Sequence, residues 1–176
     1  MRFAAAPLLL ALAACGKPQA TTAPAPSPEP APAVAPRSVE PPAPESPDGL
    51  ADDRRSVAEA PFTATSAQGA ANIVQTYYAL LEGGQGAEAA KLRADGRPPD
   101  LSAYSEYHAQ VGAPGEIEGA AGSLYVEVPV VIYGRLRQGA EVHEKGKAVL
   151  RRVNEVPGST AAQRRWHIER IELEGR

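Results

Sequence analysis

Apolar residues in the middle of the chain recur at helical spacing. From Ser66 onward they return every three or four positions, as on one face of a helix, until Gly83-Gly84 interrupts the pattern. Ser66 is a residue type that caps helix starts, and glycine commonly follows helix ends. The pattern predicts an amphipathic helix over residues 66–82, whose apolar stripe is Ala70, Ile73, Val74, Tyr77, Leu80 and Leu81.

Two shorter helices are predicted after it. Residues 87–92 carry helix-forming residues, and Arg97-Pro98-Pro99-Asp100 then breaks the chain. Residues 101–107 are predicted to form a third short helix.

From Tyr107 onward the apolar period changes to two, which indicates strands. The first strand is expected to be interrupted by a bulge at residues 112–115. In the last strand the apolar positions change parity between Ile168 and Ile171, so a bulge is expected there too. Gln138-Gly139 is predicted to be a hairpin turn. The predicted strand segments are 107–111 with 116–118, 124–136, 141–153 and 165–173.

The strand over 124–136 has two different faces. Its even-numbered positions from Leu124 to Ile132 are all apolar and are expected to pack against the first helix. The opposite face mixes aromatic, charged and apolar residues, and partly apolar sheet faces often dock partners. We therefore expect a contact surface for a partner protein or for a second copy of the chain, made by Tyr125, Glu127, Val131 and Tyr133.

Helices followed by long strands predict an α+β fold, with N-terminal helices packed on a curved antiparallel sheet of about four strands. Over residues 67–173 the pattern resembles the nuclear transport factor 2-like superfamily, on its opening segment 73–84, its long strands and its closing Arg165-Trp166-His167-Ile168. The resemblance implies a cone-shaped domain over residues 66–176. That superfamily hosts isomerases, dehydratases, transport adaptors and secretion-system assembly parts, so its fold alone does not assign function.

The chain before this domain is rich in proline. Residues 18–48 hold 11 prolines and no aromatic residue. Such a segment buries too little apolar surface to offset its ordering entropy, and it favours extended polyproline II conformations. We expect residues 15–65 to be a lipidated N-terminus and a disordered linker that lifts the domain off a membrane; a ligand for a proline-recognition module is the alternative.

The N-terminus resembles the export signal of bacterial lipoproteins. Met1-Arg2 and an apolar run lead to Leu12-Ala13-Ala14-Cys15, which looks like a lipobox, and the run is shorter than the roughly 20 residues that span a bilayer. The resemblance implies that residues 1–14 are removed as a signal peptide and that Cys15 is acylated, for example with palmitate, and anchors the chain in the lipid bilayer. Gly16 is compatible with the outer membrane, on its periplasmic or its surface side. A plain secretory signal is the alternative.

Charge and cysteine content restrict the possible partners and the ways in which the fold can be stabilised. The formal net charge is −3, and it becomes −4 when Arg2 is removed with the signal peptide. Nucleic-acid-binding proteins usually show a basic face, so we expect no nucleic-acid partner. Cys15 is the only cysteine, so the fold must be held by its core without disulfides.

No motif in the sequence defines a catalytic centre. The chain has no nucleophile-elbow or phosphate-loop pattern, and Gly84-Gln85-Gly86 follows a helix, whereas a dinucleotide-binding loop follows a strand. His108, His143 and His167 fall on three different predicted strands. Glu127 is expected to point away from the cone. We therefore expect no catalytic residues, no metal and no cofactor.

These observations favour a membrane-anchored envelope lipoprotein that binds a partner or a small ligand without catalysis. One alternative is an isomerase- or hydratase-type enzyme that acts inside the cone, and another is a structural component of an envelope assembly.

The Arg151-Arg152 and Arg164-Arg165 pairs flank one predicted loop. They are either solvated strand ends or a small basic patch that faces an acidic glycan or partner.

Overall fold

The first helix, α1 (Ala67–Glu82), begins at the serine that the sequence pattern indicates. The computed structural model describes residues 37–52 and 62–174. In it the Ser66 hydroxyl accepts a hydrogen bond from the Gly69 amide at 3.1 Å, and Gly83 caps the last turn. The predicted first helix is confirmed. The second helix, α2 (Gly86–Ala90), also forms but is shorter than predicted.

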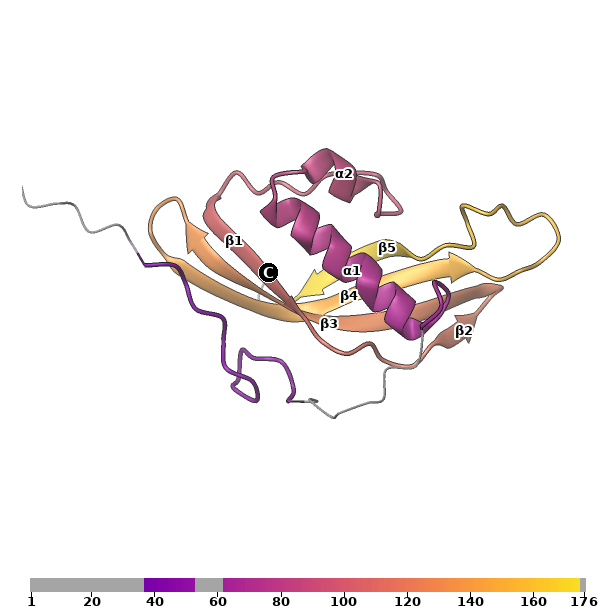
Figure 1. The fold of residues 1–176 in the computed structure, drawn as a ribbon, viewed down its shortest axis with the longest axis horizontal. Helices are drawn as coiled ribbons and strands as arrows, with labels where there is room; N and C mark the ends of the chain where they lie inside the picture. The colour runs from indigo at the N-terminus through magenta and orange to yellow at the C-terminus, as the bar shows by residue number, and fades with distance from the viewer. Residues whose placement is uncertain (1–36, 53–61, 175–176) are drawn as a thin grey trace, which may run out of the picture. The chain divides into compact units, whose positions relative to one another are not determined.

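The strands form one antiparallel sheet in the order β1-β3-β4-β5. The short β2 pairs with the beginning of β3 (Figure 1). The fold is therefore α+β, as predicted, with five strands where about four were expected. The strands are β1 (Tyr104–Val111), β2 (Glu118–Ala120), β3 (Ser123–Leu136), β4 (Glu141–Val153) and β5 (His167–Leu173).

β1 and β2 together form the interrupted strand that the sequence predicts along one side of β3. Between them the main chain keeps two bonds to β3, from the Gly112 amide to the Pro129 carbonyl at 2.9 Å and from the Gly115 amide to the Glu127 carbonyl at 2.8 Å. Pro129 has no amide hydrogen, and it lies in β3 opposite this irregular stretch. The interruption is confirmed.

The predicted third helix over residues 101–107 is wrong, because β1 already begins at Tyr104. Tyr104 pairs with Leu136 of β3, and its ring packs edge-on against Tyr107 at 5.2 Å between centroids. Pairing with a long neighbouring strand outweighs the weak helical preference of a seven-residue segment.

The bulge predicted in the last strand is confirmed. Val149 of β4 lies opposite Arg170, whereas the next residue, Leu150, lies opposite Ile168. Glu169 is therefore an extra residue in β5, and the parity of the buried positions changes across it. The predicted β3–β4 hairpin is also confirmed, with Gly139 at a φ of +95°.

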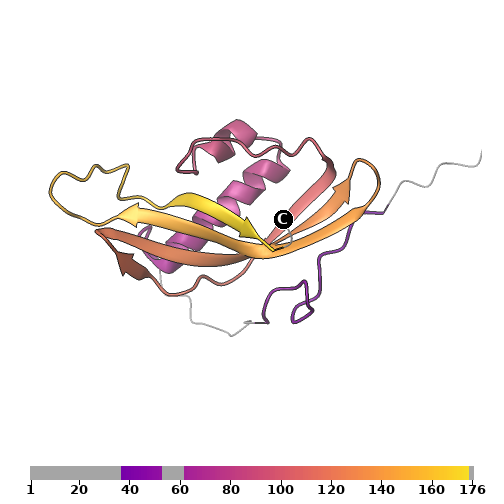
Figure 2. The same cartoon turned by 180° about the vertical axis from the view of Figure 1, so that it is seen from behind.

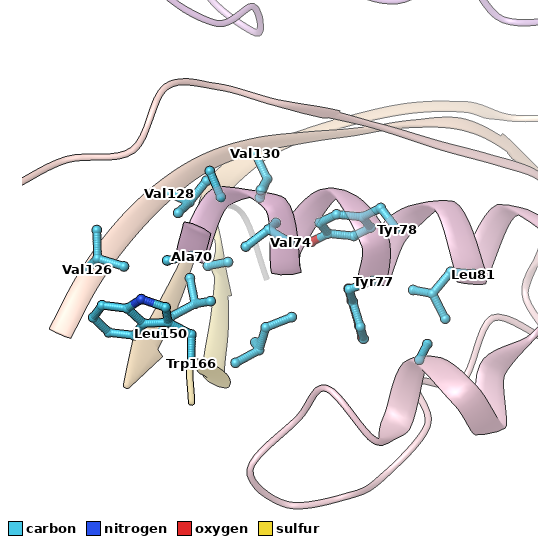
Figure 3. Packing of buried hydrophobic residues seen from close by; sticks show 14 of the residues in the cluster. Ala70, Val74, Tyr77, Tyr78, Leu81, Val126, Val128, Val130, Leu150 and Trp166 are labelled. Carbon is cyan, nitrogen blue, oxygen red and sulfur yellow. The ribbon is translucent and has the colours of Figure 1, made fainter. Parts of the chain in front are cut away.

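The core lies between α1 and one face of the sheet. In Figure 1 the helix crosses in front of the strands, and in Figure 2 it lies behind them. Val74 of α1, Val128 of β3 and Leu150 of β4 are fully buried in one cluster (Figure 3). The Trp166 indole Nε1 donates to the Ser66 carbonyl at 3.1 Å, which ties the beginning of the helix to the last strand.

Residues 37–52 differ from the free spacer that was expected for them. Val39 is only 6% exposed, and its amide donates to the Glu106 side chain of β1 at 3.0 Å. This stretch contains Val39 and Leu50, whereas large apolar residues are rare in the rest of the proline-rich segment. These two side chains give the stretch apolar surface to bury. The predictions for residues 1–36, and for residues 53–61 of the linker, lie outside the described residues.

Within the described residues, no helix combines the length and the apolar character needed to cross a membrane.

Replacing Leu150 with alanine tests the core. Leu150 is fully buried beneath α1, so the L150A variant should lose about 2–5 kcal/mol of unfolding free energy, measured by urea denaturation. Val156, which is 47% exposed, provides the control, and V156A should change the unfolding free energy by less than about 0.5 kcal/mol. Equal effects of the two variants would contradict this placement of the core.

Candidate functional site

The sheet face that points away from α1, here called the outer face, carries the contact surface predicted from the sequence. Residues at alternate positions of β3 share this face, so Tyr125, Glu127, Val131 and Tyr133 all lie on it. Their exposure differs: Glu127 is exposed, Tyr125 and Tyr133 are half-buried, and Val131 is fully buried. The predicted surface is therefore divided into an open part and a covered part.

The covered part lies beneath residues 37–52, here called the N-terminal strap. The first residues of the strap are held through their main-chain atoms. The Arg135 guanidinium donates to the Arg37 carbonyl at 3.0 Å, and His143 Nε2 lies 3.3 Å from the Glu40 carbonyl. Together with the Val39–Glu106 bond, these contacts place the start of the strap over β1, β3 and β4.

The end of the strap lies near the bend after β1. The Leu50 side chain packs at Gly112 beside the Pro129 ring, and it lines a small cavity of about 260 Å³ with Val111. The strap thus spans the outer face from the hairpin end to Gly112. Val131 lies between these two contact points along β3 and is fully buried, on a face that the sequence predicts to be open.

The open part contains a groove of about 490 Å³, here called the outer groove. It runs between the bend at residues 113–115 and the end of β5. Its apolar lining comes from Pro114, Pro129 and Leu173. Its charged lining is Glu127, Lys145, Lys147, Glu172 and Glu174.

Charges of alternating sign cross the floor of the outer groove. Lys147 Nζ lies 2.6 Å from Glu127 Oε1 and 3.7 Å from Glu172 Oε2, and Glu172 is also paired with Arg170. The hydrogen bond to Glu127 raises the pKa of Lys147, and the Arg170 guanidinium lowers the pKa of the Glu172 carboxyl. Lys147 and Glu172 are therefore ionised at neutral pH, and they give the groove a fixed pair of opposite charges.

The central space between α1 and the sheet is filled by apolar side chains, and the ionisable groups around it are mostly phenols. A hollow of about 260 Å³ remains at its edge, between Glu82 of α1 and Val111 of β1. Burial raises the pKa of Tyr77, Tyr78 and Tyr107, so these side chains stay neutral at neutral pH and are poor bases. One carboxylate, Glu144, is half-buried on the face of β4 that carries Leu150, and its charge adds to the raised pKa of Tyr107.

Glu144 is the one acid or base of this interior that the sequence reasoning did not single out. Alternation along β4 from the buried Ala148 and Leu150 places it on the core face, so strand periodicity contained the signal. The strap was also missed, since no periodic pattern marks a segment held by main-chain bonds.

The three histidines do not converge. The His108 ring stacks on Tyr133 at 5.3 Å and lies 3.4 Å from Glu106, His143 contacts the strap, and His167 lies beside the Arg165 carbonyl. Within residues 37–52 and 62–174, no group of three or more histidine, cysteine, aspartate or glutamate side chains is placed to hold a metal ion.

A charge introduced at Val39 should release the strap. V39D places a carboxylate in a buried position facing Glu106, so the strap peptide should exchange its amide hydrogens much faster, as measured by mass spectrometry. The peptide containing Val131 should gain some exchange as well.

The neighbouring Ser38 is exposed and gives a matched control with the same added charge. S38D should leave exchange in both peptides close to the unmodified chain. Fast exchange of the strap in the unmodified chain would contradict its docking.

Comparison of the chain with protein-family models, with curated proteins and with solved structures found no match. The function must therefore be inferred from the geometry and charge of the chain itself.

Proposed function

We propose that this chain is a lipid-anchored protein of the bacterial cell envelope whose domain binds a partner protein, without catalysis, through the outer groove. The observation that carries the proposal is the composition of this groove. It combines the apolar surface of Pro129 and Leu173 with the fixed charges of Glu127, Lys147 and Glu172. Apolar contact area supplies affinity at protein interfaces, and complementary charges select the partner.

The filled core supports binding on the outside of the sheet. Val74, Val128 and Ile168 are fully buried between α1 and the sheet, where a ligand would have to displace them. The outer groove needs no such displacement. A structural role within an envelope assembly would use the same surface, and it differs from partner binding only in how permanent the contact is.

The anchor is proposed from the resemblance of residues 12–15 to a lipobox, with Cys15 as the acylated residue in the outer membrane. If the strap stays docked, the tether between anchor and domain is residues 15–36. A fully extended chain of this length reaches at most roughly 70 Å at about 3.1 Å per residue. The partner would then lie close to the membrane that holds the protein.

The nuclear transport factor 2-like cone is likewise a proposal. It is supported by an N-terminal amphipathic helix that packs across a twisted antiparallel sheet with long central strands (Figure 1). Within such a cone, Glu144 beside Tyr107 favours the second candidate function, an isomerase- or hydratase-type enzyme. That function would need an opening that admits a substrate to Glu144.

Site-directed photocrosslinking in cells tests the outer groove. A photoreactive residue at Glu127 should form one discrete crosslinked product, identified by mass spectrometry. The substitution Ala113→Asp should remove it, because Ala113 is exposed and lines the groove, so the added carboxylate changes the groove without reaching the core. A photoreactive residue at the exposed Gln68 of α1 is the matched control and should not form that product. The same product from both positions, or its persistence in A113D, would overturn the proposed site.

Self-association through the groove is separated from binding of another protein by sedimentation velocity. Ala113 is a suitable position for this test because it is exposed in the groove, whereas Val131 is fully buried and Leu173 packs against the core, so a charge at either would disturb the fold. A dimer that A113D dissociates would identify a second copy as the partner.

Metabolic labelling tests the anchor. The unmodified chain should incorporate labelled palmitate and fractionate with membranes, and Cys15→Ala should do neither. The domain should remain folded, because the core cluster of the described residues is formed between Ala67 and Leu173. Incorporation of palmitate by the C15A variant would disprove acylation at this residue.

A further inference from the structure

A second hollow lies where β4 ends and β5 begins, and it shares no lining residue with the outer groove. Its volume is about 380 Å³, and it is here called the arginine cleft. Basic side chains dominate its polar lining, and Glu169 is the one carboxylate among its lining residues. The basic lining residues are Lys91, Arg93, Arg151, Arg152 and His167.

Main-chain hydrogen bonds fix two walls of the arginine cleft. On one side, residues 92–94 run beside β5, where the Ile168 amide donates to the Leu92 carbonyl and the Ala94 amide donates to the Ile168 carbonyl, both at 2.9 Å. On the other side, the Val153 amide donates to the Gln163 carbonyl at 2.8 Å. The basic side chains therefore project from a rigid frame.

Two of the basic groups are already neutralised. Arg93 donates two hydrogen bonds to Asp95, at 2.9 and 3.0 Å, and the guanidinium holds the pKa of that carboxyl well below its usual range. Lys91 lies 2.7 Å from Glu88. These pairs leave little free charge on this side of the cleft.

Arg151 and Arg152 are different, because neither takes part in an ion pair with a carboxylate of the described chain. Arg151 Nε donates to the Ser123 hydroxyl at 3.1 Å, so its terminal nitrogens remain available. Arg152 lies over the Trp166 ring at 5.6 Å, and its Nη1 donates a hydrogen bond to the Arg164 carbonyl at 3.3 Å, which leaves Nη2 for a ligand.

Two guanidinium groups that line one hollow without a carboxylate partner repel each other. An oxyanion removes this cost, because guanidinium groups bind phosphate and carboxylate through paired, charge-assisted hydrogen bonds. Arg164 and Arg165, next in the chain to the lining residue Gln163, increase the positive charge nearby. The cleft is therefore electropositive in a chain whose net charge is negative.

We propose that the arginine cleft binds a small, multivalent oxyanion, in which phosphate or carboxylate groups are carried on a compact molecule such as a sugar. Arg151 and Arg152 contribute the donors. The apolar side chains of Val153 and Ala162 in the lining contact the body of the ligand. The volume of the cleft matches a ligand of this size better than an extended polymer.

Inorganic pyrophosphate is a suitable probe, and the chain contains its own reporter. Trp166 is the only tryptophan, and it lies against Arg152. Pyrophosphate titrated into the full chain in detergent should change the Trp166 emission saturably and should give one-to-one binding by calorimetry. Citrate should bind at the same site, since it carries carboxylates in place of phosphates.

Two cleft variants and one control define the site. Arg151→Gln should weaken pyrophosphate binding at least about tenfold, as expected for the loss of a charge-assisted pair of hydrogen bonds. Arg152→Lys keeps the charge but loses the planar fork and should weaken binding several-fold. Arg137→Gln, at the hairpin end of the sheet where Arg137 donates to the Ser102 carbonyl, should bind like the unmodified chain. Circular dichroism should show that each variant is folded.

Three results would overturn the proposal. The first is no saturable binding of either anion, and the second is an equal loss in R137Q and R151Q, which would indicate general charge screening. The third is a response to phosphatidylglycerol-containing vesicles, relative to phosphatidylcholine vesicles, with no response to pyrophosphate, which would assign the arginines to a membrane surface.

Discussion

The structure depends on the burial of one helix face against the middle of two long strands. Val74 of α1 meets a surface formed by Val128 and Leu150, and all three are fully buried in one cluster. The chain has one cysteine and so no internal disulfide, and α1 is the only long helix of the described domain. The burial of this helix face is therefore the main source of stabilisation of the domain. The hydrogen bond from Trp166 to the Ser66 carbonyl then fixes the position at which the helix begins on the sheet, because it joins residues 100 positions apart.

Sheet geometry explains why both candidate sites lie outside this core. A strand that turns alternate residues inward must turn the others outward, so packing α1 on one face leaves a second face of equal length. Part of that face is covered by the strap through contacts to its main chain, and part remains as the outer groove. Two glycines shape the sheet for this arrangement, since a side chain at Gly134 or Gly146 would overlap the main chain of the adjacent strand. The arginine cleft instead forms at the end of the sheet, where the bulge at Glu169 changes the register between β4 and β5.

The sequence predicts the elements whose apolar residues recur with a regular period, and it misses the elements that lack such a period. The stripe of α1, the strands β3 and β4 and the bulge in β5 all follow from a period of 3.6 or 2 that extends over many residues. The segment that begins β1 is short, so its two tyrosines fit a helix or a strand, and only pairing with β3 decides between them. The strap could not be predicted, because main-chain groups hold its start and its two apolar side chains, Val39 and Leu50, are too far apart to form a periodic pattern. Val131 is fully buried on the face that alternation assigned to an open surface.

The charged residues also show the difference between what the sequence predicts and what only the structure reveals. Sequence alone shows that Arg151 and Arg152 are adjacent, and adjacency in a strand places them on opposite faces, which argues against a shared site. In the structure β4 ends within two residues of Arg151, and both side chains line the same hollow at the end of the sheet. What distinguishes them from Lys91 and Arg93 in the same cleft is the lack of a carboxylate partner within the described chain, and Lys147 in the outer groove is paired with two. A lysine paired with carboxylates suits a surface that must stay soluble until a protein covers it. Guanidinium groups without a carboxylate partner, held in a rigid hollow, suit a ligand that carries negative charge.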